Sequence, residues 1–139
     1  MPGYSFTDYS DTLLDHFENP RNVGSVTNPE AVGRAGNPAC GDRLDLSLRV
    51  QDGRIEQALF RASGCGAAIA SSSMTTVLLT GKTLAQAAGI TNAQVAAALG
   101  GLPPTKIHCS VLAEDAIRAA LADYERRLRG NPPGQGGDA

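Results

Sequence analysis

Aromatic residues and long apolar runs are both scarce in this chain of 139 residues. It has no Trp, three Tyr and three Phe, so its core must be built largely from Leu, Ile, Val and Ala. No apolar run approaches the roughly 18 residues that cross a bilayer. The first residues, MPGYSFTDYSDT, show neither the basic and apolar regions of a secretory signal nor the arginines of a transit peptide. We therefore expect a cytoplasmic protein with no membrane partner.

An excess of basic residues is also absent. Twelve Lys and Arg stand against 14 Asp and Glu, and no segment carries a basic stripe. This balance argues against nucleic acid as a partner. A chain of this length can close one core without disulfides or a structural metal. We predict a single domain over residues 1–129 and a disordered tail over 130–139, because GNPPGQGGDA offers nothing apolar to bury beyond one alanine.

Cysteine is rare as well, and its three positions are the most informative feature of the chain. An odd count without an export signal argues for free thiols or metal ligation rather than disulfides. Cys40 lies within PACGD, Cys65 within SGCG and Cys109 within KIHCS. Thiolates are soft ligands, imidazole is borderline and carboxylate is hard. If these cysteines converge with Asp42 and His108, they can hold a zinc ion or an iron–sulfur cluster.

Each of these residues also has an ordinary structural alternative. A lone cysteine is most often a buried apolar residue, Asp42 can cap its own turn, and His108 can cap the last helix. Cys65 and Cys109 are each expected where a helix begins, so the helix dipole should lower the pKa of both thiols. His16, on the first predicted helix, is interpreted as a surface or packing histidine and is left out of the site.

The apolar periodicity predicts an α+β fold. We expect a small antiparallel three-stranded sheet packed on one side by helices, with a long C-terminal helix. The segment over residues 102–106, with two prolines, should be extended and exposed. In chain order the expected elements are a helix over residues 7–18 capped by Thr7 or Ser10, an edge strand near 31–35, strands over 44–50 and 55–62 joined by an Asp52-Gly53 turn, a helix over 67–80, short helices over 83–88 and 91–99, and a last helix over 110–129.

Several stretches, taken together, resemble the IscU family of iron–sulfur cluster assembly scaffolds, which includes the N-terminal domain of NifU. The resemblance covers about residues 9–128. The matching stretches are Tyr9-Ser10, HFENPRNVG over 16–24, ACGD over 39–42, GCGAAIASSS over 64–73, LPPTKIHCS over 102–110 and AEDAI over 113–117.

This resemblance implies a scaffold that builds a transient [2Fe-2S] cluster and passes it to carriers or apo-proteins, and it does not imply an enzyme. Carried over by position, Cys40, Cys65 and Cys109 would bind the cluster, with Asp42 and His108 as the other site residues. Cys109 would be the principal acceptor of persulfide sulfur. Iron is the expected metal, and Zn²⁺ would fill the same tetrahedral position in the isolated protein.

The resemblance also implies partners. A cysteine desulfurase would supply sulfur and apo iron–sulfur proteins would receive clusters, while a frataxin-like protein, a ferredoxin and an Hsp70-type chaperone system stay open. The family's chaperone-binding segment corresponds to Leu102, Pro103, Pro104, Thr105 and Lys106, but Thr105 replaces the family's usual valine. The further cysteine-bearing domains of NifU are not in this sequence, so we expect a stand-alone scaffold.

One rival hypothesis comes from another class. It is a zinc-bound sulfur acceptor that stimulates a cysteine desulfurase without building a cluster, as in the SufU branch. The resemblance places this chain on the IscU side, because it has His108 next to Cys109 and a compact Gly100-Gly101 connection. A purely structural zinc fold is the weakest alternative, because the core needs no metal to close.

Overall fold

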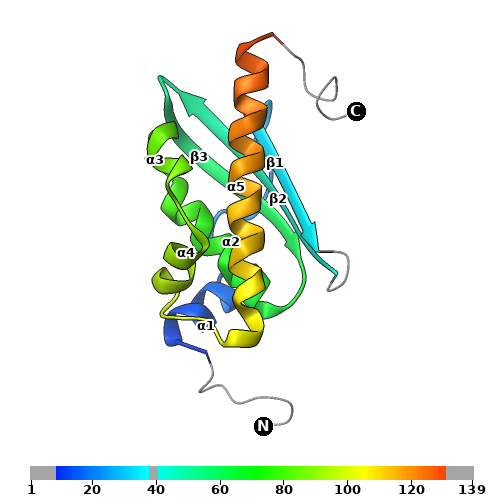
Figure 1. The fold of residues 1–139 in the computed structure, drawn as a ribbon, viewed down its shortest axis with the longest axis vertical. Coiled ribbons are helices and arrows are strands. Elements are labelled where there is room, and N and C mark those ends of the chain that lie inside the picture. The colour runs from blue at the N-terminus through cyan, green and yellow to red at the C-terminus, as the bar shows by residue number, and fades with distance from the viewer. Residues whose placement is uncertain (1–8, 38–40, 131–139) are drawn as a thin grey trace.

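The computed structural model describes residues 9–37 and 41–130, which form three antiparallel strands with helices against one face (Figure 1). The predicted fold class is confirmed. The strands are β1 (Ala31–Asn37), β2 (Asp42–Gln51) and β3 (Arg54–Ser63), in the order β1-β2-β3. The helices are α1 (Asp11–Glu18), α2 (Gly66–Leu79), α3 (Leu84–Ala88), α4 (Asn92–Ala98) and α5 (Ile107–Leu128), with a short 3-10 helix over Pro104–Lys106.

Strands β2 and β3 form the predicted hairpin. Asp52 and Gly53 both have positive φ, 55° and 74°, the conformation of the two-residue turn that matches the twist of antiparallel strands. Alternate residues of β2 are buried, namely Leu44, Leu46 and Leu48. The sheet therefore has one face toward the core and one outer face, as a period of two requires.

Helix α5 lies along the core face of the sheet, close to β1 (Figure 1). A Cβ at Gly33 would overlap the carbonyl oxygen of Ala116 and lie 2.5 Å from the backbone nitrogen of Ala120. The absence of a side chain at Gly33 thus lets the helix backbone rest on the strand. Near its C-terminal end, α5 is held by Asp123, whose Oδ2 accepts a hydrogen bond of 2.8 Å from the backbone N–H of Val32.

Helix α2 is buried almost all round, between the sheet, α1 and α5. Its buried hydroxyls donate to carbonyls one turn back, for example Ser72 to Ala68 at 2.8 Å and Thr75 to Ser71 at 2.7 Å. These bonds satisfy polar groups that burial would otherwise penalise. The predicted helix is confirmed, one residue earlier at each end.

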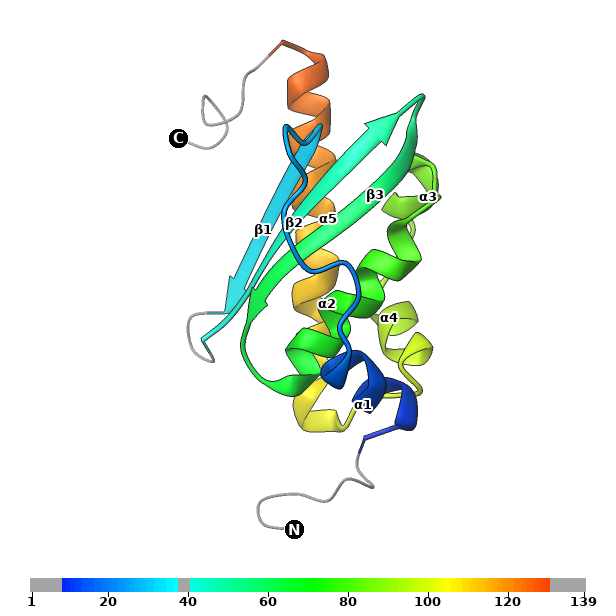
Figure 2. The same ribbon diagram turned by 180° about the vertical axis from the view of Figure 1, so that it is seen from behind.

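The segment between α1 and β1 crosses the outer face of the sheet (Figure 2). Asn22 and Gly24 exchange backbone hydrogen bonds with Phe60 of β3, and the backbone N–H of Val26 donates to the Ser47 hydroxyl at 2.9 Å. Within the described residues, no helix is both long and apolar enough to cross a membrane.

Helix α1 begins later than predicted. Ser10 is its N-cap, with a side chain that accepts from the Leu13 N–H at 2.9 Å and donates to the Leu99 carbonyl. The alternative cap, Thr7, lies outside the described residues, as do positions 131–139 of the expected tail.

Candidate functional site

Two cysteine sulfurs lie side by side where two helices begin. Cys65 is the N-cap of α2, and Cys109 lies in the first turn of α5. Their Sγ atoms are 3.7 Å apart. Cys65 is half-buried, whereas Cys109 is buried against Ala67 and Ala68. The fold thus brings together the thiols of two residues that are 44 positions apart in the sequence.

An acid and an imidazole stand next to this pair. Asp42, the first residue of β2, is buried, and its Oδ2 lies 3.9 Å from the Cys109 Sγ and 3.5 Å from Nε2 of His108. The His108 Nε2 lies 3.7 Å from the Cys109 Sγ. One ligand atom from each of these three residues lies within 4.8 Å of the others, close enough to bind one metal ion.

Gly64 makes room for the Asp42 carboxylate. Its φ is +142°, and a Cβ built there would lie 3.0 Å from the Asp42 Cγ and closer still to Oδ1. The glycine therefore allows the turn before Cys65 to pass directly over the acid. Among sequence signals, the Gly64-Cys65-Gly66 triplet indicated close backbone approach, but not which side chain would be approached.

The predicted lowering of the Cys109 pKa is wrong for the protein without metal. Burial, together with the nearby Cys65 and Asp42, raises the pKa of Cys109 to about 12. Burial disfavours the thiolate more than the first turn of a helix favours it. Since a metal ligand must be deprotonated, binding of a cation at these donors would release the Cys109 proton.

Of the five predicted site residues, the structure brings four together. The side chains of Asp42, Cys65 and His108 each lie within 4 Å of the Cys109 sulfur, and we call these four residues the cysteine site. Cys40 lies outside the described residues. Two thiolates at 3.7 Å would repel each other by about 4 kcal/mol at an effective dielectric constant near 20. The pair is therefore suited to a cation or a positively charged iron core that removes this repulsion.

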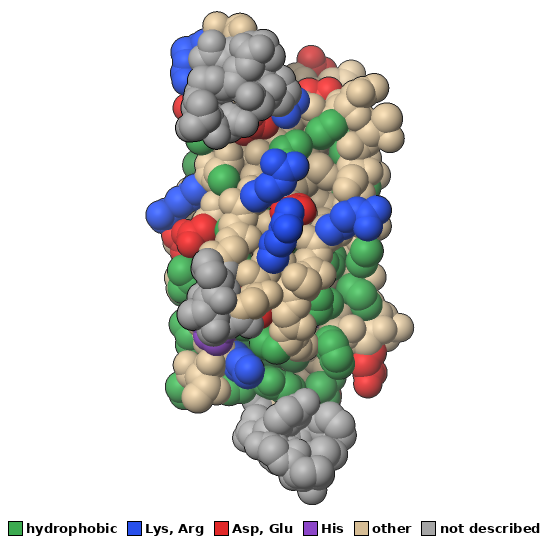
Figure 3. Space-filling model, turned by 90° about the vertical axis from the view of Figure 1, so that its right-hand side faces the viewer, with side chains coloured by type: hydrophobic (Ala, Val, Ile, Leu, Met, Phe, Trp, Pro, Cys, Tyr) green, Lys and Arg blue, Asp and Glu red, His purple; other side chains and the backbone are tan. Residues whose placement is uncertain are grey.

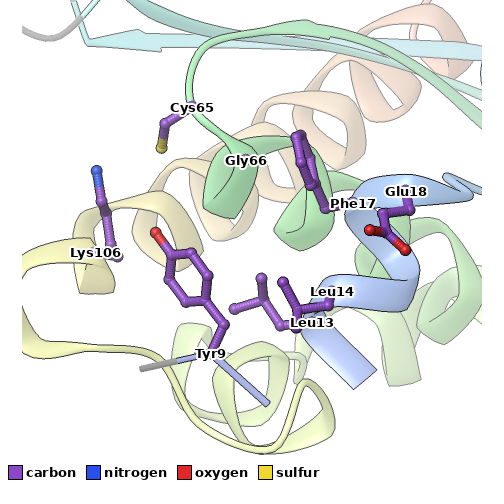
Figure 4. A pocket seen from close by; sticks show the side chains of 8 residues that line it. All are labelled: Tyr9, Leu13, Leu14, Phe17, Glu18, Cys65, Gly66 and Lys106. Carbon is purple, nitrogen blue, oxygen red and sulfur yellow. The ribbon is translucent and has the colours of Figure 1, made fainter. Parts of the chain in front are cut away.

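A hollow of about 310 Å³ opens beside Cys65. Figure 4 shows Tyr9 and Lys106 directed toward the Cys65 sulfur, and Phe17 beside Gly66. A thiolate charge on Cys65 is the main cause that raises the pKa of Lys106, so this lysine offers a cation to the sulfur. This hollow was not predicted from the sequence. The helical spacing of Tyr9 and Phe17 does not distinguish a pocket wall from the core.

The segment over residues 102–106 differs from its prediction. Pro104–Lys106 is a 3-10 helix, and α5 follows it from Ile107, three residues earlier than expected. Proline is tolerated at the first position of a helix because its missing N–H would have no partner there. Pro104 and Thr105 are exposed, as predicted, while Leu102, Pro103 and Lys106 are half-buried.

His16 is a packing histidine. It is buried, and its Nδ1 lies 2.7 Å from the Ser73 hydroxyl on α2. It is not part of the group of Asp42, His108 and Cys109 that could hold a metal, which agrees with its exclusion from the predicted site.

Comparison with known proteins gives consistent matches over almost the whole chain. The family described as NifU-like N terminal domain matches residues 8–130. The iron–sulfur cluster assembly scaffold protein IscU of Escherichia coli K12 is 53% identical over 123 residues, which span 86% of this chain and 95% of that protein. The iron–sulfur cluster assembly scaffold protein IscU 1 of Archaeoglobus fulgidus is 53% identical over 119 residues, 86% of this chain and 78% of that protein.

Solved structures agree at the level of the fold. The crystal structure of a nitrogen-fixing NifU-like protein (N-terminal) from Brucella abortus superposes with a TM-score of 0.67 at 19% identity. The match covers 88% of this chain and 97% of that one. At this identity the likeness supports the architecture and nothing about the site.

Proposed function

This chain belongs to the NifU-like N-terminal domain family, and from that premise we propose that it is a scaffold on which an iron–sulfur cluster is assembled and then released. The observation that carries the proposal is the convergence of the Cys65 and Cys109 sulfurs, 3.7 Å apart, with Asp42 and His108. The cluster is cargo, so the protein is a scaffold and not an enzyme. Action in the cytoplasm stays a prediction from the sequence.

We propose that the cargo is a [2Fe-2S] cluster held by Cys40, Cys65 and Cys109. The fourth position falls to His108 or Asp42, whose ligand atoms lie 3.5 Å apart. Durable clusters are usually held by four thiolates, and neither imidazole nor carboxylate matches iron in a sulfide core as well. A mixed ligand set therefore favours release to an incoming thiolate. Zn²⁺ suits the same donors in the isolated protein.

Sulfur would arrive from a cysteine desulfurase as a persulfide. We propose Cys109 as its acceptor, in keeping with its place between Cys65, Asp42 and His108. The thiolate of Cys109 attacks the outer sulfur of the desulfurase persulfide, and the desulfurase cysteine leaves as a thiolate. Because Cys109 is buried, the segments around it must move apart before the partner's persulfide can reach its sulfur. Apo iron–sulfur proteins are the proposed recipients.

Anaerobic reconstitution with ferrous iron, cysteine and a cysteine desulfurase tests the proposal. We expect the visible absorption of a two-iron cluster, followed by its transfer to an apo-ferredoxin. Cys65→Ser and Cys109→Ser should each prevent a stable cluster, and mass spectrometry should find no trapped persulfide at position 109 in the latter. Desulfurase stimulation with zinc retained and no chromophore would instead establish the zinc-bound sulfur acceptor.

The role of Asp42 has its own test. If its carboxylate makes the ligand set exchangeable, Asp42→Ala should still assemble the cluster but transfer it more slowly. Asp115→Ala is the matched control, because Asp115 is an exposed aspartate of α5 away from the cysteine site. Equal transfer rates for the wild type and Asp42→Ala would remove this role and leave His108 as the proposed fourth ligand.

A further inference from the structure

Three arginines surround one aspartate on the outer face of the sheet. Arg34 of β1 and Arg61 of β3 lie on either side of Asp45 in the register of β2. Arg43 lies two residues before Asp45 and so points to the same face. Directly opposed residues on one face are about 5 Å apart at Cβ. We call Arg34, Arg43 and Arg61 the arginine cluster.

Asp45 neutralises only part of this positive charge. Its carboxylate lies 3.7 Å from Arg34 Nε and 3.3 Å from Arg43 Nη2, while Arg61 Nε donates to the Ser25 hydroxyl at 3.1 Å. Within residues 9–37 and 41–130, no other carboxylate forms an ion pair with the arginine cluster. The side chains of Arg34 and Arg43 are 69% and 64% exposed. Most of their N–H donors therefore face solvent.

Space for a ligand's carboxylates exists between the guanidinium groups. Arg43 stands between Gly36 and Ser63 in the register of the sheet, and both neighbours are small. Two hollows result on either side of it. One, of about 190 Å³, is bordered by Asp45 and Arg61, and the other, of about 300 Å³, by Arg34. Guanidinium groups that border open hollows can bind carboxylates through two parallel hydrogen bonds.

The arginine cluster is exposed and reaches to within one residue of Asp42 of the cysteine site. The segment that crosses the outer face touches it at one edge, where Ser25 accepts the hydrogen bond from Arg61, and continues to Val26, whose N–H donates to Ser47. Lys and Arg side chains gather across the middle of the side shown in Figure 3, with little acidic surface between them. Arg43 directly follows Asp42, the first residue of β2. A partner bound at Arg43 therefore lies at the end of the sheet that carries the cysteine site.

We propose that the arginine cluster is the docking surface for a partner protein with an acidic face. The charge of the cluster is opposite to that of the whole chain, which is −2, so it selects where an acidic partner can approach. Nucleic acid fits less well, because three cations within one small area meet few of the roughly 6–10 phosphates that such proteins contact. Docking of an acidic partner on the arginine cluster does not depend on the proposed function. Only the idea that this partner delivers or receives sulfur, iron or the iron–sulfur cluster rests on it.

Binding of a fluorescein-labelled oligoglutamate peptide to the full chain without metal tests the inference by fluorescence anisotropy. We expect binding at about 10 mM salt that weakens at about 150 mM, where screening shortens the range of charge interactions. The combined variant Arg34→Gln, Arg43→Gln and Arg61→Gln should lose at least about tenfold in affinity. All three side chains are exposed, so circular dichroism should show an unchanged fold.

The matched control removes the same number of charges elsewhere. Arg54→Gln, Arg118→Gln and Arg129→Gln, all exposed, should leave peptide affinity within about twofold of the wild type. Equal losses in both combined variants, or no binding by the wild type, would overturn the inference. So would tighter binding of an oligodeoxynucleotide of the same length to the arginine cluster. The peptide-binding assay contains no iron–sulfur cluster. A failed reconstitution of that cluster would therefore count against the proposed function alone and leave this inference unaffected.

Discussion

Gly64→Ala is the substitution that most directly probes how the chain holds Asp42 in the cysteine site. Gly64 has a φ of +142°, and an added Cβ would lie 3.0 Å from the Asp42 Cγ and 3.2 Å from the Ala68 Cβ. Two costs therefore combine, a backbone conformation that alanine rarely adopts and an overlap with a buried carboxylate. Gly53→Ala is the control, because Gly53 has a φ of +74° with no atom near the new Cβ.

The expected magnitudes separate the two variants. Alanine at a positive φ costs about 1–2 kcal/mol, and this is all that Gly53→Ala should lose. Forcing an extra methyl group into a filled space adds about 1–3 kcal/mol. We therefore expect Gly64→Ala to reduce the free energy of unfolding by about 2–5 kcal/mol, most of a marginally stable domain's reserve at the upper end.

Urea denaturation of the protein without metal measures both losses. The double variant Gly64→Ala with Asp42→Ala should recover about 1–3 kcal/mol of the single variant's loss, because it removes the overlapping carboxylate. If Gly64→Ala costs no more than Gly53→Ala, the close approach of the turn to Asp42 is refuted. Absence of any recovery in the double variant would refute the assignment of the overlap to this carboxylate.

Three further outcomes are expected. Burial lowers the pKa of His16 from its ordinary value of 6.5, so on acidification the unfolded chain takes up a proton before the folded protein does. The free energy of unfolding should therefore fall as the pH drops below about 6.5. His16→Gln should flatten that part of the pH profile measured by urea denaturation, and an unchanged slope would contradict the reasoning. Cys109 is buried, with a pKa raised to about 12, so iodoacetamide at about pH 8 should modify Cys65 before Cys109, as peptide mass spectrometry would show. The reverse order for these two cysteines would contradict the burial of Cys109. Thr105→Val should strengthen binding to an Hsp70-type chaperone in an anisotropy assay, because an apolar side chain replaces a polar one, while Thr105→Ser should not. Equal chaperone affinities of Thr105→Val and the wild type would exclude the segment over residues 102–106 as the chaperone's site.

The sheet was predictable because its signals are local. Alternating leucines in β2 and the Asp52-Gly53 turn indicate a hairpin without any knowledge of distant residues. The beginnings of α1 and α5 were less predictable. Ser10 caps α1 while also bonding to Leu99, and that distant partner cannot be read from the sequence. At α5, the two prolines suggested an extended segment, although proline is compatible with a helix's first turn.

The candidate site was predictable in its residue types and not in its geometry. Soft and borderline ligands indicated metal chemistry at Cys65, which lies between two glycines, and at Cys109, which follows a histidine. Their separation depends on how α2 and α5 pack against the sheet, which no local pattern states. The same packing buries Cys109, and this reversed the pKa shift that helix position alone predicted. Burial is a property of the whole fold, so sequence reasoning had no access to it.

The close packing of α5 against Gly33 links the cysteine site to the far end of this helix. Because backbone lies against backbone there, the helix has no soft side-chain layer in which to shift, and Asp123 ties its far end to β1. Cys109 and Asp123 are 14 residues apart, about 21 Å along a helix. We therefore expect a substitution of Asp123 to alter the position of Cys109 at the other end of the helix, although Asp123 contacts none of the residues of the cysteine site.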